Sequence, residues 1–122
     1  MNTQLRVLYV DDEESLRRLV PTQLSLEGFD VATADDGDTA IEALRHDSYD
    51  IVLLDIRMPR KSGIEVLRFI RSQNISSRVI MLTAVDDLSV ALEAIKHGAN
   101  DYLTKPYELE NLLASIKRVS AN

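Results

Sequence analysis

The chain has 122 residues, of which 45% are hydrophobic, and this is enough for one compact domain with a buried core. Its 20 acidic and 14 basic residues give a formal charge of −6, which argues against direct binding of nucleic acid or of an anionic membrane by this chain. Cysteine is absent, which excludes disulfides, thiolate metal sites and thiol catalysis.

Five short apolar runs, β-branched or Leu-rich and bounded by polar residues, predict strands. They span residues 6–10, 29–34, 51–54, 79–83 and 101–104. The third run is apolar without alternation, which indicates a strand that is covered on both faces.

Between and after these runs, apolar residues recur at helical spacing and predict five helices. The recurring positions are Leu16, Leu19, Val20 and Leu24; Ala40, Ile41 and Leu44; Ile64, Leu67 and Ile70; Leu88, Ala91, Leu92 and Ile95; and Leu109, Leu112, Leu113 and Ile116. Pro21 falls inside the first helix and should bend it, because proline lacks a backbone N–H. Gly98 is well placed to end the fourth helix.

Five repeats of strand then helix predict an α/β fold, in which helices cover both faces of an open, doubly wound parallel sheet. No low-complexity stretch or linker divides the chain. The start of the chain carries no cleavage signal, and no segment approaches the roughly 18 apolar residues of a membrane span. We therefore expect a single cytoplasmic domain over residues 1–122, with no output domain in this chain and no membrane contact.

Ligands of such a sheet bind outside the carboxyl ends of its strands. Asp11 and Asp12 follow the first predicted strand, and Asp55 follows the third. Thr83 ends the fourth strand, and Lys105 follows the fifth. Clustered carboxylates need a cation, and an all-oxygen set favours Mg²⁺, which commonly also binds a phosphate oxygen. A lysine and a hydroxyl would stabilise the phosphoryl group, and one carboxylate could serve as its nucleophile.

These residues, taken in order, make the sequence resemble the receiver domain of two-component response regulators over essentially its whole length. The matching stretches are Asp11-Asp12 after VLYV, LLDIRMP with Asp55, the following Gly63, MLTA with Thr83, and YLTKP with Tyr102 and Lys105-Pro106. The resemblance implies a flavodoxin-like, CheY-like sheet of five parallel strands in the order 2-1-3-4-5.

The resemblance also implies a phosphorylation site. Asp55 would accept a phosphoryl group from the phosphohistidine of a sensor histidine kinase or of a histidine phosphotransfer protein. Asp12 and Asp55 would bind Mg²⁺, for which Mn²⁺ is a plausible substitute. Asp11 would bind it directly or through water, and the backbone carbonyl of Arg57 would complete the protein ligands.

A conformational switch is implied as well. Lys105 would pair with the phosphoryl group, and the Lys105-Pro106 peptide bond would be cis. Thr83 would move toward the phosphoryl oxygens while Tyr102 turns inward. The fourth helix, the fifth strand and the fifth helix would form the readout surface and a homodimer interface. The domain would be a switch more than an enzyme, although it catalyses its own phosphotransfer, and its expected output is transcription.

Two positions of the family pattern concern hydrolysis of the acyl phosphate. They are occupied here by Arg57 and Val85. Val85 cannot orient an attacking water, and Arg57 is placed to lie across the phosphoryl group, so we expect slow autodephosphorylation. Pro21 would alter the surface that docks the kinase.

Plainer interpretations stay open for single positions. The acidic run 11–14 could simply cap the first helix, and Thr83 could be a capping hydroxyl. Lys105 could be a solvated turn residue, and Tyr102 a static, half-buried ring. The two histidines lie near predicted helix ends, and we interpret them as structural.

Other functions fit the sequence less well than that of a receiver. A nucleotide-binding Rossmann domain would need clustered glycines after the first strand, and the four glycines here are scattered. A haloacid-dehalogenase-like phosphatase would need an acid two residues after its nucleophile, where Arg57 stands. A degenerate receiver that acts only as a phosphorylation-independent interaction module is the better rival, but it would normally lack Asp55 or Lys105.

Overall fold

A computed structural model describes residues 4–121. The first three residues and the last residue of the predicted domain lie outside the described residues. Within them, five strands alternate with five α-helices. The elements are β1 (Arg6–Val10), α1 (Glu14–Leu26), β2 (Asp30–Ala34), α2 (Gly37–His46), β3 (Ile51–Asp55), α3 (Gly63–Ser72), β4 (Arg78–Thr83), the short 3-10 helix η1 (Val85–Asp87), α4 (Leu88–Lys96), β5 (Asp101–Thr104) and α5 (Leu109–Ser120). No helix in this range is both long and apolar enough to cross a membrane.

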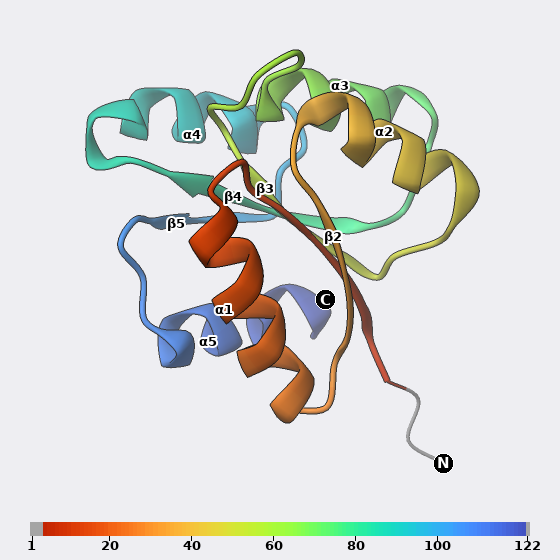
Figure 1. The fold of residues 1–122 in the computed structure, drawn as a ribbon. Coiled ribbons are helices and arrows are strands. Elements are labelled where there is room, and N and C mark those ends of the chain that lie inside the picture. Colours follow the sequence, from red (N-terminus) through yellow and green to blue (C-terminus); the bar gives the residue numbers. More distant parts are fainter. Residues whose placement is uncertain (1–3, 122) are drawn as a thin grey trace.

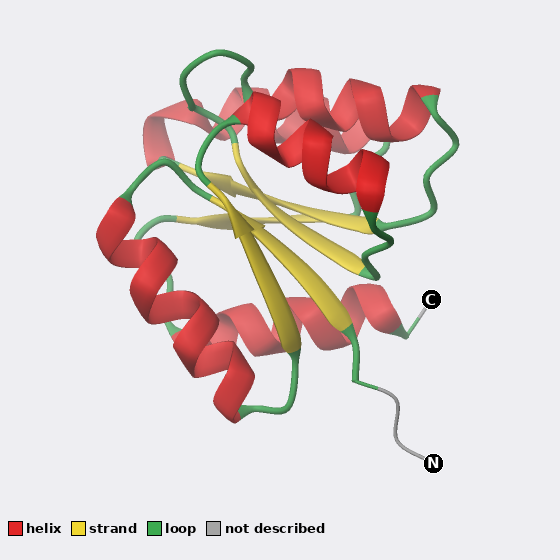
Figure 2. Cartoon of the chain, turned by 45° about the vertical axis from the view of Figure 1, so that its right-hand side comes forward, coloured by secondary structure: helices red, strands yellow, loops and turns green. Residues whose placement is uncertain are grey.

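The strands form one parallel sheet in the order β2-β1-β3-β4-β5, which confirms the predicted topology. Helices α1 and α5 cover one face, and α2, α3 and α4 cover the other (Figures 1 and 2). In the register of the sheet, Val10 of β1 lies opposite Leu54 of β3. The carboxyl ends of these two central strands are therefore neighbours, and the residues that follow them emerge side by side.

The side chains of β3 alternate between two separate hydrophobic cores. Val52 and Leu54 pack in the core beneath α2, α3 and α4, whereas Ile51 and Leu53 pack in the core beneath α1 and α5. Every residue of β3 is buried. A strand inside a covered parallel sheet needs apolar groups on both sides, which explains the unbroken run of residues 51–54.

Helix ends account for one boundary that differs from the sequence expectation. Gly98 follows α4 with a φ of +109° and donates its N–H to the Ile95 carbonyl, as predicted for a helix-ending glycine. Gly28 ends α1 in the same way, and the next residue, Phe29, donates its N–H to the Leu24 carbonyl at 3.1 Å. Phe29 was predicted to start a strand. It lies instead in the turn after α1, because its N–H closes the end of the helix rather than joining the sheet.

Pro21 lies inside α1, as the sequence indicates, and the helix continues to Leu26. Without an N–H, Pro21 leaves the Arg17 carbonyl without its helical donor. The bend at this position stays a prediction.

Candidate functional site

Three carboxylates come together where the two central strands end. Asp11 and Asp12 follow β1, and Asp55 is the last residue of β3. One carboxylate oxygen from each lies within 4.8 Å of the others. Asp11 and Asp55 are buried, and Asp12 is exposed. The cluster therefore has two buried acids and one that faces solvent.

Lys105 is the cation that this structure places against the cluster. Its ammonium donates to Asp11 Oδ2 at 2.8 Å and to Asp55 Oδ2 at 3.1 Å. The loop that carries it is held by a hydrogen bond from the Lys105 N–H to the Thr83 carbonyl at 2.7 Å, and the Lys105-Pro106 bond is cis. Burial disfavours the charged amine, but the bonds to the two carboxylates raise the pKa of Lys105 above its ordinary value.

Asp55 is buried strongly enough to change its acidity. Burial raises the pKa of the Asp55 carboxyl from 3.8 to about 6, the negative charges of Asp11 and Asp12 act in the same direction, and Lys105 opposes them. A further cation in the cluster would stabilise the ionised Asp55 carboxylate. An all-oxygen cluster with one acid open to solvent fits a hydrated ion such as Mg²⁺, so Asp11, Asp12 and Asp55 are suited to hold it.

The loop after Asp55 folds back against the end of β3, and this requires Gly63. The Gly63 N–H donates to the Ile56 carbonyl at 2.8 Å. A Cβ at position 63 would lie 2.2 Å from the Asp55 carbonyl oxygen, so no side chain fits there. Ser62 begins α3 by accepting the Glu65 N–H at 3.3 Å. The glycine of the motif thus keeps the acceptor loop close to the strand.

Thr83 and Tyr102, the two residues expected to form a switch, lie on the neighbouring strands β4 and β5. Thr83 is fully buried at the end of β4, and its hydroxyl donates to the Ala84 carbonyl at 3.0 Å. Tyr102 of β5 is half-buried and packs against the core beneath α4. The Thr83 hydroxyl is bonded to the main chain in this structure, not to the carboxylates.

Arg57 lies differently from the sequence expectation. Its guanidinium forms a two-point ion pair with Asp87, in which Nη2 approaches Oδ1 at 2.5 Å and Nε also contacts Oδ2. The hydrogen bond from Arg57 lowers the pKa of the Asp87 carboxyl below its ordinary value. Val85, at the start of η1, is 70% exposed. The sequence carries no local signal for this pair, because thirty positions separate its partners.

Two tyrosines that sequence reasoning missed extend the site. The hydroxyl of Tyr9 lies 3.2 Å from Asp11 Oδ2 and 2.7 Å from the hydroxyl of Tyr107. Burial raises the pKa of both tyrosines above the ordinary value, so both stay protonated hydrogen-bond donors. One signal was available for Tyr9, since positions two apart in a strand share a face and Tyr9 precedes Asp11 by two.

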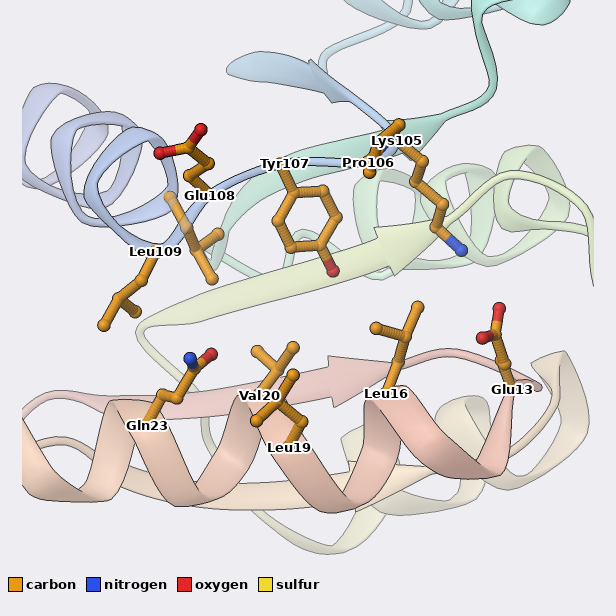
Figure 3. A pocket seen from close by; sticks show the side chains of 11 residues that line it. Glu13, Leu16, Leu19, Val20, Gln23, Lys105, Pro106, Tyr107, Glu108 and Leu109 are labelled. Atoms are coloured by element: carbon orange, nitrogen blue, oxygen red, sulfur yellow. The ribbon is translucent and has the colours of Figure 1, made fainter.

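A groove of about 530 Å³ opens between α1 and α5, next to the loop that carries Lys105 (Figure 3). Its walls are mainly apolar, and they include Leu16, Leu19, Val20, Leu109 and Leu112. Tyr107 projects from the loop before α5 into the space between the two helices (Figure 3). Tyr107 therefore lines the groove and is also hydrogen-bonded to Tyr9, the partner of Asp11.

The histidines take no part in the acidic cluster. His46 Nε2 lies 2.6 Å from Glu42, and His97 Nε2 lies 3.4 Å from Glu93. In each case the glutamate is four residues earlier, which is a common surface pairing on helices.

Comparison with known proteins gives a consistent result. Residues 7–117 match the family described as the response regulator receiver domain. The chain is 40% identical over 113 residues to regulatory protein AtoC of Escherichia coli, covering 93% of this chain and 24% of that protein. It is 41% identical over 113 residues to response regulator MprA of Mycobacterium leprae, covering 93% of this chain and 50% of that protein. The chain thus spans half or less of the length of these relatives.

Solved structures agree in fold over nearly the whole chain. The receiver domain of the Francisella response regulator 1452 superposes with a TM-score of 0.89 at 32% identity, covering 97% of this chain and 98% of that chain. The chemotaxis response regulator CheY4 of Vibrio cholerae gives a TM-score of 0.88 at 34% identity, covering 96% and 99% of the two chains.

Proposed function

The chain belongs to the response regulator receiver domain family, and on that premise we propose that Asp55 is its phosphoacceptor. A receiver domain is the phosphorylated module of two-component signalling. The observation that carries the assignment is the position of Lys105, whose ammonium bridges Asp11 and Asp55 in a pocket that also holds Asp12. A pocket of this kind can accept a cation and a phosphoryl group together.

The ligand set for the cation is the one that the resemblance to receiver domains implies. Asp12 and Asp55 would bind Mg²⁺, with Asp11 binding directly or through water and the Arg57 carbonyl completing the protein ligands. Mn²⁺ would substitute, because it accepts the same oxygen ligands. The bound ion supplies positive charge at the phosphoryl oxygens. The raised pKa of Asp55 supports this proposal, since burial makes an ionised carboxylate costly without a cation.

The phosphotransfer step uses the ionised Asp55 carboxylate. One of its oxygens attacks phosphorus, a new O–P bond forms, and the N–P bond of the donor phosphohistidine breaks. The leaving imidazole nitrogen keeps the bonding electron pair and takes a proton from solvent. Lys105 then moves from Asp11 to a phosphoryl oxygen, and Thr83 exchanges its bond to the Ala84 carbonyl for another.

The conformational change follows from that exchange. When Thr83 moves toward the phosphoryl group, it vacates space that Tyr102 fills by turning inward. The two packings need differ by only a few kcal/mol for phosphorylation to shift their populations. The readout surface comprises α4, β5 and α5, where Leu92 and Ile95 are partly exposed apolar groups. The same surface would serve as a homodimer interface.

The partner and the output follow from the family. A sensor histidine kinase or a histidine phosphotransfer protein would supply the phosphoryl group. Several relatives are named as transcriptional regulatory proteins, which supports a transcriptional output for the whole protein. The rival, a degenerate receiver that works without phosphorylation, is disfavoured because Asp55 and Lys105 are both present and in contact.

Hydrolysis of the acyl phosphate would be slow. Val85 is exposed but offers no group to orient a water, and Arg57 is engaged by Asp87. We expect Val85→Glu to shorten the half-life of phosphorylated Asp55, whereas Leu26→Glu, the same kind of change at an exposed position at the end of α1, should not. A half-life that Val85→Glu leaves unchanged would count against this part of the proposal.

Intact mass spectrometry tests the main proposal. The protein is incubated with acetyl phosphate, with and without Mg²⁺, beside the Asp55→Asn variant. We expect one phosphoryl adduct that requires Mg²⁺ and is lost in the variant. If no adduct forms with any small phosphodonor, the phosphoacceptor function is refuted in favour of the interaction module.

A further inference from the structure

Three groups outside the acidic cluster donate hydrogen bonds to the Asp11 carboxylate. Its Oδ1 accepts the backbone N–H of Glu13 at 2.9 Å, and its Oδ2 accepts both Lys105 at 2.8 Å and the Tyr9 hydroxyl at 3.2 Å. Tyr9 is itself fully buried and in contact with the Tyr107 hydroxyl at 2.7 Å. Asp11 is thus fixed from two sides within the protein interior.

The direction of these hydrogen bonds follows from counting protons. A carboxylate oxygen can only accept, so the single hydroxyl proton of Tyr9 points to Asp11. The bond between the two tyrosines must then use the proton of Tyr107, with the Tyr9 oxygen as acceptor. The hydrogen bonds therefore run in series from Tyr107 to Tyr9 to Asp11.

We propose that Tyr9 and Tyr107 are positioning residues, which hold the Asp11 carboxylate in the orientation that the divalent cation needs. The proposal rests on the proposed function, because it concerns the same Mg²⁺ site. Neither tyrosine touches the reacting atoms. Tyr9 acts on Asp11, and Tyr107 acts only through Tyr9.

The reason for such support lies in the double role of Lys105. It donates to Asp11 and to Asp55 at once, and it must leave Asp11 to reach an incoming phosphoryl oxygen. When it leaves, the Tyr9 hydroxyl is the remaining protein donor to Asp11 Oδ2 among residues 4–121. Without that hydroxyl, Asp11 Oδ2 would be free to rotate away during phosphotransfer, the step at which the site must keep its geometry.

Magnesium binding to the unphosphorylated protein tests the proposal. Tyr9→Phe keeps the buried ring and removes only the hydroxyl, so the core keeps its packing. We expect isothermal titration calorimetry to show about a tenfold weaker Mg²⁺ affinity for Tyr9→Phe, the usual size of effect for a group that orients a metal ligand. Tyr49→Phe, the same change in the other core cluster, should bind Mg²⁺ as the wild type does.

The order of the hydrogen bonds, from Tyr107 to Tyr9 to Asp11, predicts how the two substitutions combine. Tyr107→Phe alone should weaken Mg²⁺ binding less than Tyr9→Phe, because Tyr9 keeps its own proton on Asp11. The double variant should be no weaker than Tyr9→Phe, since Tyr107 has no route to Asp11 once the Tyr9 hydroxyl is gone. Wild-type affinity in Tyr9→Phe, or losses from the two changes that add in full, would overturn the proposal.

A readout without metal separates this proposal from the proposed function. The Glu13 amide proton reports the position of Asp11 through its bond to Oδ1. Its NMR chemical shift should move upfield in Tyr9→Phe and stay in place in Tyr49→Phe. If the wild type binds no Mg²⁺, the proposed function fails, and the Glu13 amide then tests only whether Tyr9 orients Asp11: an unmoved signal in Tyr9→Phe refutes that orientation, and a moved one supports it.

Discussion

Removing the charge of Asp55 should stabilise the unphosphorylated protein when no divalent cation is present. Asp55 is 6% exposed, and burial raises its pKa from 3.8 to about 6 in the folded state. A carboxyl with a raised pKa is easier to ionise in the unfolded chain than in the folded one. Ionised Asp55 therefore costs stability, and Asp55→Asn removes that cost while it keeps the shape of the side chain.

The magnitude follows from the pKa. The rise from 3.8 to about 6 corresponds to roughly 3 kcal/mol at neutral pH. Solvent at the open side of the pocket, where Asp12 is exposed, screens part of the charge, so we expect about 1.5 kcal/mol. The gain should be full above about pH 6 and absent below about pH 4, where the carboxyl is protonated in both states.

Urea unfolding in chelator-treated buffer at pH 7.5 measures this difference. Asp86→Asn, in which an exposed carboxylate of η1 is removed, is the matched control and should stay within about 0.5 kcal/mol of the wild type. Adding Mg²⁺ to ten times its dissociation constant should stabilise the wild type by about 1.4 kcal/mol and Asp55→Asn by less. An Asp55→Asn variant that is no more stable than the wild type without Mg²⁺ would refute the reasoning.

Three further changes probe contacts that hold the fold together. Gly63→Ala would place a Cβ 2.2 Å from the Asp55 carbonyl oxygen. We expect the free energy of unfolding to fall by about 1–3 kcal/mol and phosphorylation by acetyl phosphate to be slower. An unchanged melting temperature would contradict the close contact. Arg71 donates to the carbonyls of Gly98, Ile75 and Ser77 and to the Asn100 side chain. Arg71→Met should therefore lower the free energy of unfolding in urea by about 2–4 kcal/mol. A loss below about 0.5 kcal/mol would argue against a stabilising role for these hydrogen bonds. The pKa of the Asp87 carboxyl is lowered by Arg57, so its pairing stabilises the folded state above about pH 4 and is lost as pH falls through the lowered value. Asp87→Asn should therefore be less stable than the wild type at pH 7 but equal to it in strong acid, and equal stabilities at pH 7 would rule the pairing out as a stabilising contact.

Much of the fold was predictable because each strand carries its own local signal. The run of residues 51–54 is apolar at every position, and the structure buries it on both faces. Phe29 shows the limit of this reasoning. It has the composition of a strand residue, but its N–H is used to close α1 through Leu24, and this depends on the positive φ of Gly28.

Some residues of the site were likewise predictable from the sequence, and some of its contacts were not. Asp11, Asp55 and Lys105 could be named from strand ends, because parallel strands bring their carboxyl ends to one edge of the sheet. The ion pair between Arg57 and Asp87 could not be predicted, since it depends on where two loops far apart in sequence meet. The bond between the Tyr9 and Tyr107 hydroxyls depends likewise on a loop that reaches β1 from the far end of the chain.

The central claim is that Asp55 receives the phosphoryl group, and chemical trapping tests it most directly. The protein is treated with acetyl phosphate and Mg²⁺, and sodium borohydride then reduces any acyl phosphate, which converts the modified aspartate to homoserine. Peptide mass mapping should find homoserine at position 55, and only when both the donor and Mg²⁺ were present. Homoserine at another acidic position, or unmodified Asp55 in protein that carries a phosphoryl adduct, would contradict the account.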